Sequence, residues 1–244
     1  QASTAIDAED AVNAATAAFE TWRKTPVSQR AKVLNKAADY LEANAQRFGE
    51  ELSREEGKPV AQGKDEFLRA AQTFRFYATE GQTFGGETYV QDDADMMVYS
   101  QREPLGVVSV ISPWNYPFQL AMAPLLTALI AGNAVILKPS ELCLPVGQAI
   151  IDLFAGLDLP EGLVQGLVGA GETGQHLIDA GPDLVFFTGG LSAGRAVMQR
   201  AARHPIPVLL ELGGKDAMLV FEDADLQRAS AAALYGAFCN SGQV

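Results

Sequence analysis

Apolar residues recur at helical spacing in the first third of the chain. Between Asp7 and Thr79 the sequence is rich in Ala, Glu, Gln, Lys and Arg. The apolar positions near the middle of this stretch are Val33, Leu34, Ala37, Tyr40 and Leu41. Residues three and four apart share one face of a helix, so the pattern predicts several helices that pack through an apolar face.

A different pattern begins near residue 81. Gly81 and Gly86 interrupt the helical spacing, and two short β-type runs follow at 87–90 and 96–101, with three aspartates between them. Short runs joined by a polar loop are typical of a β-hairpin. We expect a pair of strands that projects from the body over residues 86–104.

After Pro104 short apolar runs alternate with helical segments. The runs are 107–111, 134–137, 163–168, 184–187 and 208–210. Alternation of this kind is typical of a parallel sheet covered on both faces. The predicted fold class is therefore α/β, a Rossmann-like open parallel sheet with helices on both faces, N-terminal helices and a projecting β-hairpin. Such sheets bind ligands where strands end and helices begin.

Charge limits the range of partners. The chain has 244 residues, 48% of them hydrophobic, which is enough to bury a substantial core. Thirty acidic residues against eighteen basic ones give a net charge of −12. Because phosphate backbones and anionic lipids repel such a charge, we expect no nucleic acid and no membrane as partners. No metal site is predicted.

Several features indicate a cytoplasmic protein. The apolar stretches are shorter than the roughly 20 residues of a membrane helix. The first twenty residues hold four acids and no basic group, unlike a signal peptide. Two cysteines, Cys143 and Cys239, are too few for a disulfide framework. Because the chain opens at Gln1 rather than Met, we expect its native start to be absent from this sequence.

Two glycine motifs have more than one interpretation. Gly169, Gly171 and Gly174 spell G-x-G-x-x-G after a predicted strand, as in a dinucleotide fingerprint. The acid that such a fingerprint places about twenty residues later is missing around Ser192, so these glycines can equally make a tight helix entry.

Gly190, Ser192 and Gly194 spell G-x-S-x-G, which raises a serine hydrolase as an alternative. Only His204 follows Ser192, with no acid between them. The remaining partners of a triad would have to come from outside this chain.

Five segments together are more specific than either motif. The chain reads ISPWNYP from Ile111, LKPSE from Leu137, FFTGG from Phe186, ELGGK from Glu211 and FCNSGQV from Phe238. In this order and spacing they resemble the aldehyde dehydrogenase family over essentially the whole chain. The resemblance implies a coenzyme-binding domain at 1–212 and the beginning of a catalytic domain at 213–244. It also implies that the 86–104 hairpin joins subunits, so we expect a homodimer or homotetramer.

The implied activity is oxidation of an aldehyde to a carboxylic acid, with hydride transfer to NAD or NADP through a cysteine thiohemiacetal and thioester. Hydride leaves readily only from a carbon that bears an oxyanion, and the side-chain amide of Asn115 could donate to that oxyanion. A turn residue beside Pro117 is the plain alternative. Glu211 corresponds to the family's general base, and we expect it to be partly withdrawn from water with a raised pKa.

The resemblance also implies a cofactor site. Lys138 and Glu141 could hold the adenosine ribose, and a carboxylate at Glu141 would repel a 2′-phosphate, so NAD is expected and NADP is the alternative. The alternative to a ribose-binding role is that Ser140 caps a helix and that Lys138 and Glu141 are solvated charges on either side of it. The implied cofactor residues are Ile111, Ser112, Trp114, Asn115, Lys138, Ser140, Glu141, Gly171, Phe187, Thr188, Gly189, Gly190, Leu212 and Gly213.

The chain departs from the family at two places. Gly190 replaces a usual serine, and Pro124 replaces a lysine whose relay role cannot be carried over. The family's catalytic cysteine would follow Val244 immediately, and neither Cys239 nor Cys143 is promoted in its place, because both are expected to pack. The fragment alone is therefore expected to bind nucleotide at most, and a non-catalytic relative is the alternative.

Tyr116 and Leu120 are expected to border the substrate tunnel and to favour an apolar or aromatic aldehyde.

Overall fold

The computed structural model describes residues 2–93 and 95–244. At its centre lies a five-stranded parallel sheet with the strand order β5-β4-β3-β6-β7. The strands are β3 (Val107–Ile111), β4 (Ala134–Lys138), β5 (Val164–Gly166), β6 (Leu184–Gly189) and β7 (Val208–Leu212). The α/β fold class predicted from the sequence is confirmed.

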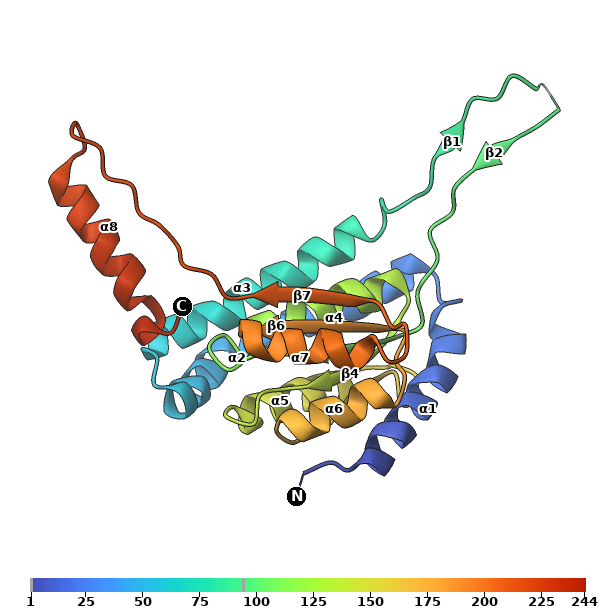
Figure 1. The fold of residues 1–244 in the computed structure, drawn as a ribbon, viewed down its shortest axis with the longest axis horizontal. Coiled ribbons are helices and arrows are strands. Elements are labelled where there is room, and N and C mark those ends of the chain that lie inside the picture. Colours follow the sequence, from blue (N-terminus) through green and yellow to red (C-terminus); the bar gives the residue numbers. More distant parts are fainter. Residues whose placement is uncertain (1, 94) are drawn as a thin grey trace.

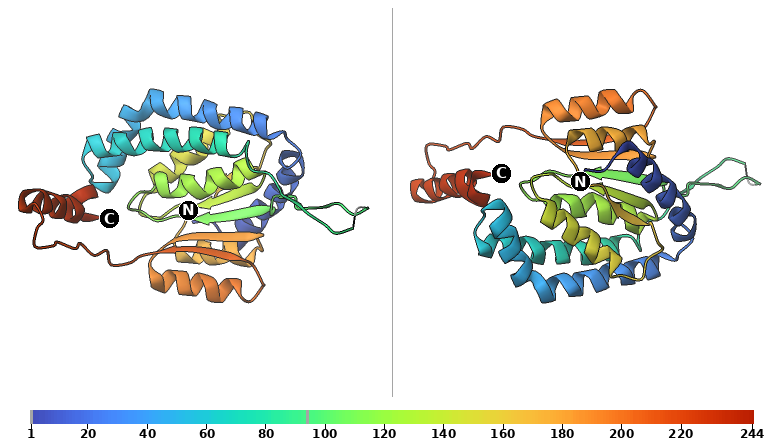
Figure 2. Two further views of the ribbon diagram at one scale, coloured as in Figure 1. Left: turned by 90° about the horizontal axis from the view of Figure 1, so that it is seen from above. Right: turned by 90° about the horizontal axis from the view of Figure 1, so that it is seen from below.

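Helices cover both faces of the sheet (Figure 2). On one face lie α4 (Gln119–Ala131) and α5 (Leu144–Ala155), and on the other lie α6 (Gly171–Asp179) and α7 (Leu191–Ala201). Every residue of β3 and β4 is buried, which explains why these strands read as unbroken apolar runs. The edge strands β5 and β7 are only partly buried.

Three long helices precede the sheet: α1 (Ala5–Trp22), α2 (Val27–Glu56) and α3 (Val60–Glu80). The helices α2 and α3 form a hairpin that packs over α4. Gly57 ends α2 in the left-handed conformation, with φ of 84°, and Pro59 precedes the first turn of α3. The short connection 57–59 therefore brings Glu56, Lys58 and the start of α3 close together.

The predicted hairpin is present but its strands are short. Strand β1 (Thr88–Tyr89) pairs antiparallel with β2 (Val98–Tyr99), and the pair projects away from the body (Figure 1). Ala94, within the predicted 86–104 segment, lies outside the described residues.

The last part of the chain leaves the sheet and then returns. Residues 213–225 run outward from β7, helix α8 (Leu226–Phe238) comes back towards the α2–α3 connection, and a 3₁₀ turn (Cys239–Gly242) follows (Figure 1). Within the described residues, no helix combines the length and the apolar character needed to cross a bilayer.

Candidate active site

A cavity of about 550 Å³ lies at the carboxyl ends of the central strands. The chain adds β4 and β5 on one side of β3 and then β6 and β7 on the other, so the crevice between β3 and β6 is the switch point at which such sheets bind ligands. Predicted cofactor residues in the cavity wall are Ile111, Ser112, Trp114, Lys138, Ser140, Glu141, Gly171, Phe187, Thr188, Gly189 and Gly190.

Three predicted cofactor residues lie outside this wall. Asn115 follows Trp114 on the same turn, but its side-chain amide points to the end of the chain. Leu212 pairs with Gly189 in the sheet, and its side chain packs against Gly194 instead of facing the cavity. Gly213 lies one residue beyond the sheet and is exposed.

The cavity contains a polar group without a partner. The hydroxyl oxygen of Ser112 is buried and makes no hydrogen bond in the described part of the chain. At Gly171 and Gly190 a Cβ atom would meet nothing within 4 Å, so the backbone at both positions is open to a ligand. At Gly189 a Cβ would lie 2.6 Å from the ring of Phe187, which explains the glycine there. The cavity therefore offers both a free hydroxyl and accessible backbone.

A charged pair lines the β4 side of the cavity. The Lys138 ammonium lies 3.3 Å from a carboxylate oxygen of Glu141. Burial lowers the pKa of Lys138. The pKa of Glu141 is also lowered, mainly because the Glu141 carboxylate accepts a hydrogen bond from the backbone amide of Glu141 itself. Glu141 is therefore a stable anion whose side chain is about half exposed at the cavity rim.

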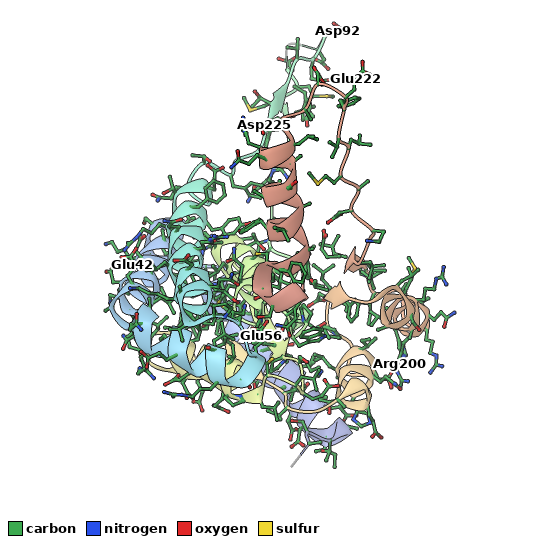
Figure 3. All side chains as sticks on the ribbon, turned by 90° about the vertical axis from the view of Figure 1, so that its left-hand side faces the viewer. Glu42, Glu56, Asp92, Arg200, Glu222 and Asp225 are labelled. Atoms are coloured by element: carbon green, nitrogen blue, oxygen red, sulfur yellow. The ribbon has the colours of Figure 1, made fainter. Side chains whose placement is uncertain are left out.

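One face of α7 also lines the cavity, and the sequence interpretation missed it. Ala193, Val197 and Arg200 lie on this face, and the Arg200 Nε atom donates to Asp179 of α6 over 2.8 Å. Figure 3 shows Arg200 on α7 at the side of the molecule. The spacing of three and four residues between these positions could have identified the face.

Asn115 lies beside the last turn of the chain. Its side-chain nitrogen donates to the backbone oxygen of Gln243 over 2.8 Å. The predicted oxyanion donor and the residue just before Val244 are thus brought into direct contact, although 128 positions separate them in the sequence.

The neighbouring Tyr116 and Leu120 are half-buried. The Tyr116 hydroxyl lies 4.0 Å from the sulfur of Cys239, and burial is the main cause that raises the pKa of Tyr116 to about 12. Cys143 is buried against the backbone oxygen of Trp114. Burial also raises the pKa of the Cys143 thiol to about 12, which makes it a poor nucleophile, as expected of a packing residue.

Glu211 differs from its expected environment. The sequence interpretation placed it partly out of water, but its side chain is exposed. Strand β7 is the edge of the sheet, and α7 packs only against one of its faces. Glu211 shares the other face with Leu209, which is 52% exposed.

The serine hydrolase alternative gains no support from the geometry. Ser192 is exposed at the start of α7, and His204 lies beyond the far end of this helix. Nine residues of the helix, 193–201, follow Ser192 before the chain reaches His204, which corresponds to about 13 Å. Ser192 and His204 cannot form a hydrogen-bonded pair.

Comparison with known proteins agrees with the sequence resemblance. A sequence profile of the aldehyde dehydrogenase family matches residues 1–244. A Methylomonas protein named 4,4'-diapolycopene aldehyde oxidase is 59% identical over 228 residues, which cover 91% of this chain and 43% of the relative. The Bacillus subtilis alpha-ketoglutaric semialdehyde dehydrogenase is 37% identical and is matched over 100% of this chain and 50% of its own length.

Solved structures show the same relationship. The NAD-dependent aldehyde dehydrogenase from Sinorhizobium meliloti superposes with a TM-score of 0.96 at 34% identity, covering 100% of this chain and 49% of that protein. The chain spans about half the length of the curated relatives it matches. It belongs to the aldehyde dehydrogenase family.

Proposed function

We propose that the protein containing this chain oxidises an aldehyde to a carboxylic acid and transfers hydride to a nicotinamide cofactor. The observation that carries the proposal is the contact between Asn115 and Gln243 next to the cavity at the strand ends. The Asn115 amide, held beside Gln243, can stabilise the oxyanion that forms when a nucleophile next in the chain attacks an aldehyde. In the family this nucleophile is a cysteine.

The role of Asn115 follows from its amide. Attack of a thiolate on an aldehyde makes a tetrahedral adduct with a negative oxygen, and a fixed donor stabilises this oxygen more than it stabilises the aldehyde. The donor is held in place because the Asn115 backbone oxygen accepts from the Asn240 side chain over 2.6 Å. Nicotinamide, when bound, supplies the hydride acceptor.

The cavity suits a dinucleotide. Thr188, Gly189 and Gly190 lead into the N-terminus of α7, where backbone amides and the helix dipole favour a pyrophosphate. Lys138 and Glu141, which form an ion pair at the cavity rim, are proposed to bind ribose hydroxyls. The structural neighbours support a nicotinamide cofactor, because one is PnpE in complex with nicotinamide adenine dinucleotide. An NADP-dependent enzyme from E. coli is also similar, and we propose NAD because the Glu141 carboxylate would repel a 2′-phosphate.

Glu211 is proposed as the general base that activates water for hydrolysis of the thioester. It lies at the end of β7, paired in register with Thr188. In the complete enzyme, Glu211→Gln is expected to retain a pre-steady-state burst of reduced cofactor and to lower the steady-state rate, because deacylation would become slow. The exposed Glu222, on the segment 213–225, provides the control Glu222→Gln (Figure 3). Normal turnover of the Glu211→Gln enzyme would exclude this role.

We propose an apolar aldehyde as the substrate. The half-buried Tyr116 and Leu120 next to Asn115 favour it, and so does the name of the Methylomonas relative. The complete enzyme should show a higher kcat/KM for decanal than for the charged succinic semialdehyde. A preference for the charged substrate would reject this assignment.

A homodimer or homotetramer joined through the projecting hairpin is also proposed. Apolar side chains exposed there include Tyr89, Val90, Met97 and Tyr99. Sedimentation of the complete protein, with and without residues 87–101, tests this, and an unchanged oligomer after the deletion would contradict it.

A further inference from the structure

A buried ion cluster lies beneath the turn that carries Asn115. The Lys58 ammonium is 3.1 Å from a carboxylate oxygen of Glu56 and 2.5 Å from one of Glu66. The side chains of all three residues are at most 1% exposed. The ring of Tyr116 covers the ammonium, whose nitrogen is 4.4 Å from the ring centre.

The cluster holds the Asn115 turn at both ends. Lys58 Nζ donates to the Asn115 backbone oxygen over 3.4 Å. The second carboxylate oxygen of Glu66 accepts from the backbone amides of Phe118 and Gln119, over 3.2 and 3.1 Å, where α4 begins. Glu66 therefore joins Lys58 to the first turn of α4, so the Asn115 turn is held at Asn115 itself and at the start of α4.

The same cluster holds the last turn of the chain. Asn240 and Ser241 have φ of 55° and 58°, a left-handed conformation that costs non-glycine residues about 1–2 kcal/mol each. Glu56 Oε1 accepts from the Asn240 side chain over 3.2 Å. The Asn240 backbone amide donates to Gln62 over 3.0 Å. A strained turn of this kind persists only where its surroundings fix it.

Figure 3 shows Glu56 near the end of α8, where the chain returns to the α2–α3 connection. Asn240 links the two turns directly, because its side-chain nitrogen donates to both Glu56 and the Asn115 backbone oxygen. The end of α2, the connection 57–59 and the start of α3 thus contact both the donor turn and the turn that leads to Val244.

We infer that Lys58, together with Glu56 and Glu66, positions the Asn115 amide relative to the turn that precedes the catalytic nucleophile. This inference rests on the proposed function. The three are positioning residues, because they touch the backbone of the donor turn and not the reacting atoms.

The energetics of the cluster agree with a positioning role. Burying three ionisable side chains loses hydration, and apolar residues of similar volume would often stabilise a fold equally well. The cluster instead supplies directional contacts to both turns. Burial is also the main cause that raises the pKa of Glu56 to about 7, against the opposing effect of Lys58. The charged groups that face Glu56 are Lys58 and Glu66, so the charge of the cluster changes around neutral pH.

The test uses the complete enzyme with Lys58→Met, and Lys36→Met on the exposed side of α2 as the matched control. Displacement of the donor by about 1 Å is expected to lower kcat by about 100-fold. KM and Kd for NAD should change less than twofold, because the cavity is built from other residues. In an Asn115→Ala background, Lys58→Met should cause little further loss, since the group that it positions is already gone.

Two further variants keep the test decisive if Lys58→Met does not fold. Glu56→Gln preserves shape and should remove an ionisation near pH 7 from the kcat profile. Asn240→Ala removes the link between the turns and should lower kcat without weakening NAD binding. If the wild type is active, the inference would be overturned by an unchanged kcat in Lys58→Met or Asn240→Ala, by an ionisation near pH 7 that persists in Glu56→Gln, or by a loss that is fully additive with Asn115→Ala. An inactive wild type would instead reject the proposed function.

Discussion

The carboxylate of Glu141 lies at the cavity rim, and from its position we predict how it affects the choice between NAD and NADP. Its side chain is about half exposed and paired with Lys138. In the complete enzyme, Glu141→Gln should raise the ratio of kcat/KM for NADP to that for NAD, because the repulsion of a 2′-phosphate is removed and Lys138 remains. Initial rates with both cofactors measure it, and Glu161→Gln, at an exposed loop position, is the control. An unchanged ratio would contradict the assignment.

Glu56 makes a prediction about stability. Its pKa in the fold, about 7, lies above its ordinary value of 4.5, so the folded protein binds the proton more tightly than the unfolded chain does. The contribution of the Glu56 carboxyl group to the free energy of unfolding is therefore fully present below about pH 4.5 and is lost as the pH rises through 7. Urea unfolding at pH 5 and pH 8 should show a smaller difference for Glu56→Gln than for the wild type. Glu9→Gln, on the surface of α1, should keep the wild-type difference.

At the residue scale, the sequence located side chains that lie at or just after the carboxyl end of a strand, and their roles in cofactor binding stay predictions. Ser112, Lys138 and Thr188 lie in the cavity wall because parallel strands end at a common edge. Sequence reasoning failed for Glu211, since exposure depends on which face of an edge strand is covered. It could not find Lys58, because the sequence shows a lysine between glycine and proline and gives no sign of the turns that fold over it.

At the scale of elements, α2 and α3 pack backbone to backbone. A Cβ atom at Gly63 would lie 2.6 Å from the backbone oxygen of Gly49. Gly63→Ala should therefore destabilise the protein by about 1–3 kcal/mol, as overpacking usually does. Chemical denaturation measures the change. Gly156→Ala is the matched control, because its Cβ would make only ordinary contacts of 3.5 Å at φ of −79° and should change stability little. Equal effects of the two substitutions would contradict this account.

Elements were predicted well where burial is complete. The run 107–111 and strand β3 coincide, and both faces of this strand are covered. At the edges the agreement was poorer. The predicted run 163–168 contains a strand of three residues, Val164–Gly166. The hairpin strands have only two residues each. An edge strand has one neighbouring strand in the sheet, and the hairpin strands pair only with each other. The length of such strands depends on this pairing, which the spacing of apolar residues does not reveal.

At the scale of the whole molecule, the residues that line the cavity all lie between positions 111 and 203. The 244-residue chain should therefore bind NAD even if it does not catalyse the oxidation of an aldehyde. A concentration of NAD one hundred times its Kd would add about 2.7 kcal/mol to stability. Thermal melts should show this as an increase in Tm of several degrees that Lys138→Met diminishes. No increase at millimolar NAD would contradict the cavity assignment.

The buried ion cluster also constrains how relatives of this protein can diverge. Loss of one partner leaves an uncompensated charge inside the molecule, which usually costs about 3–5 kcal/mol. Positions 56, 58 and 66 are therefore expected to be inherited as a set, with substitutions that occur together or not at all. An aromatic ring at position 116 should accompany the lysine. Lineages that lose the set should have rebuilt the turn at 240–242, because its left-handed residues would have lost their support.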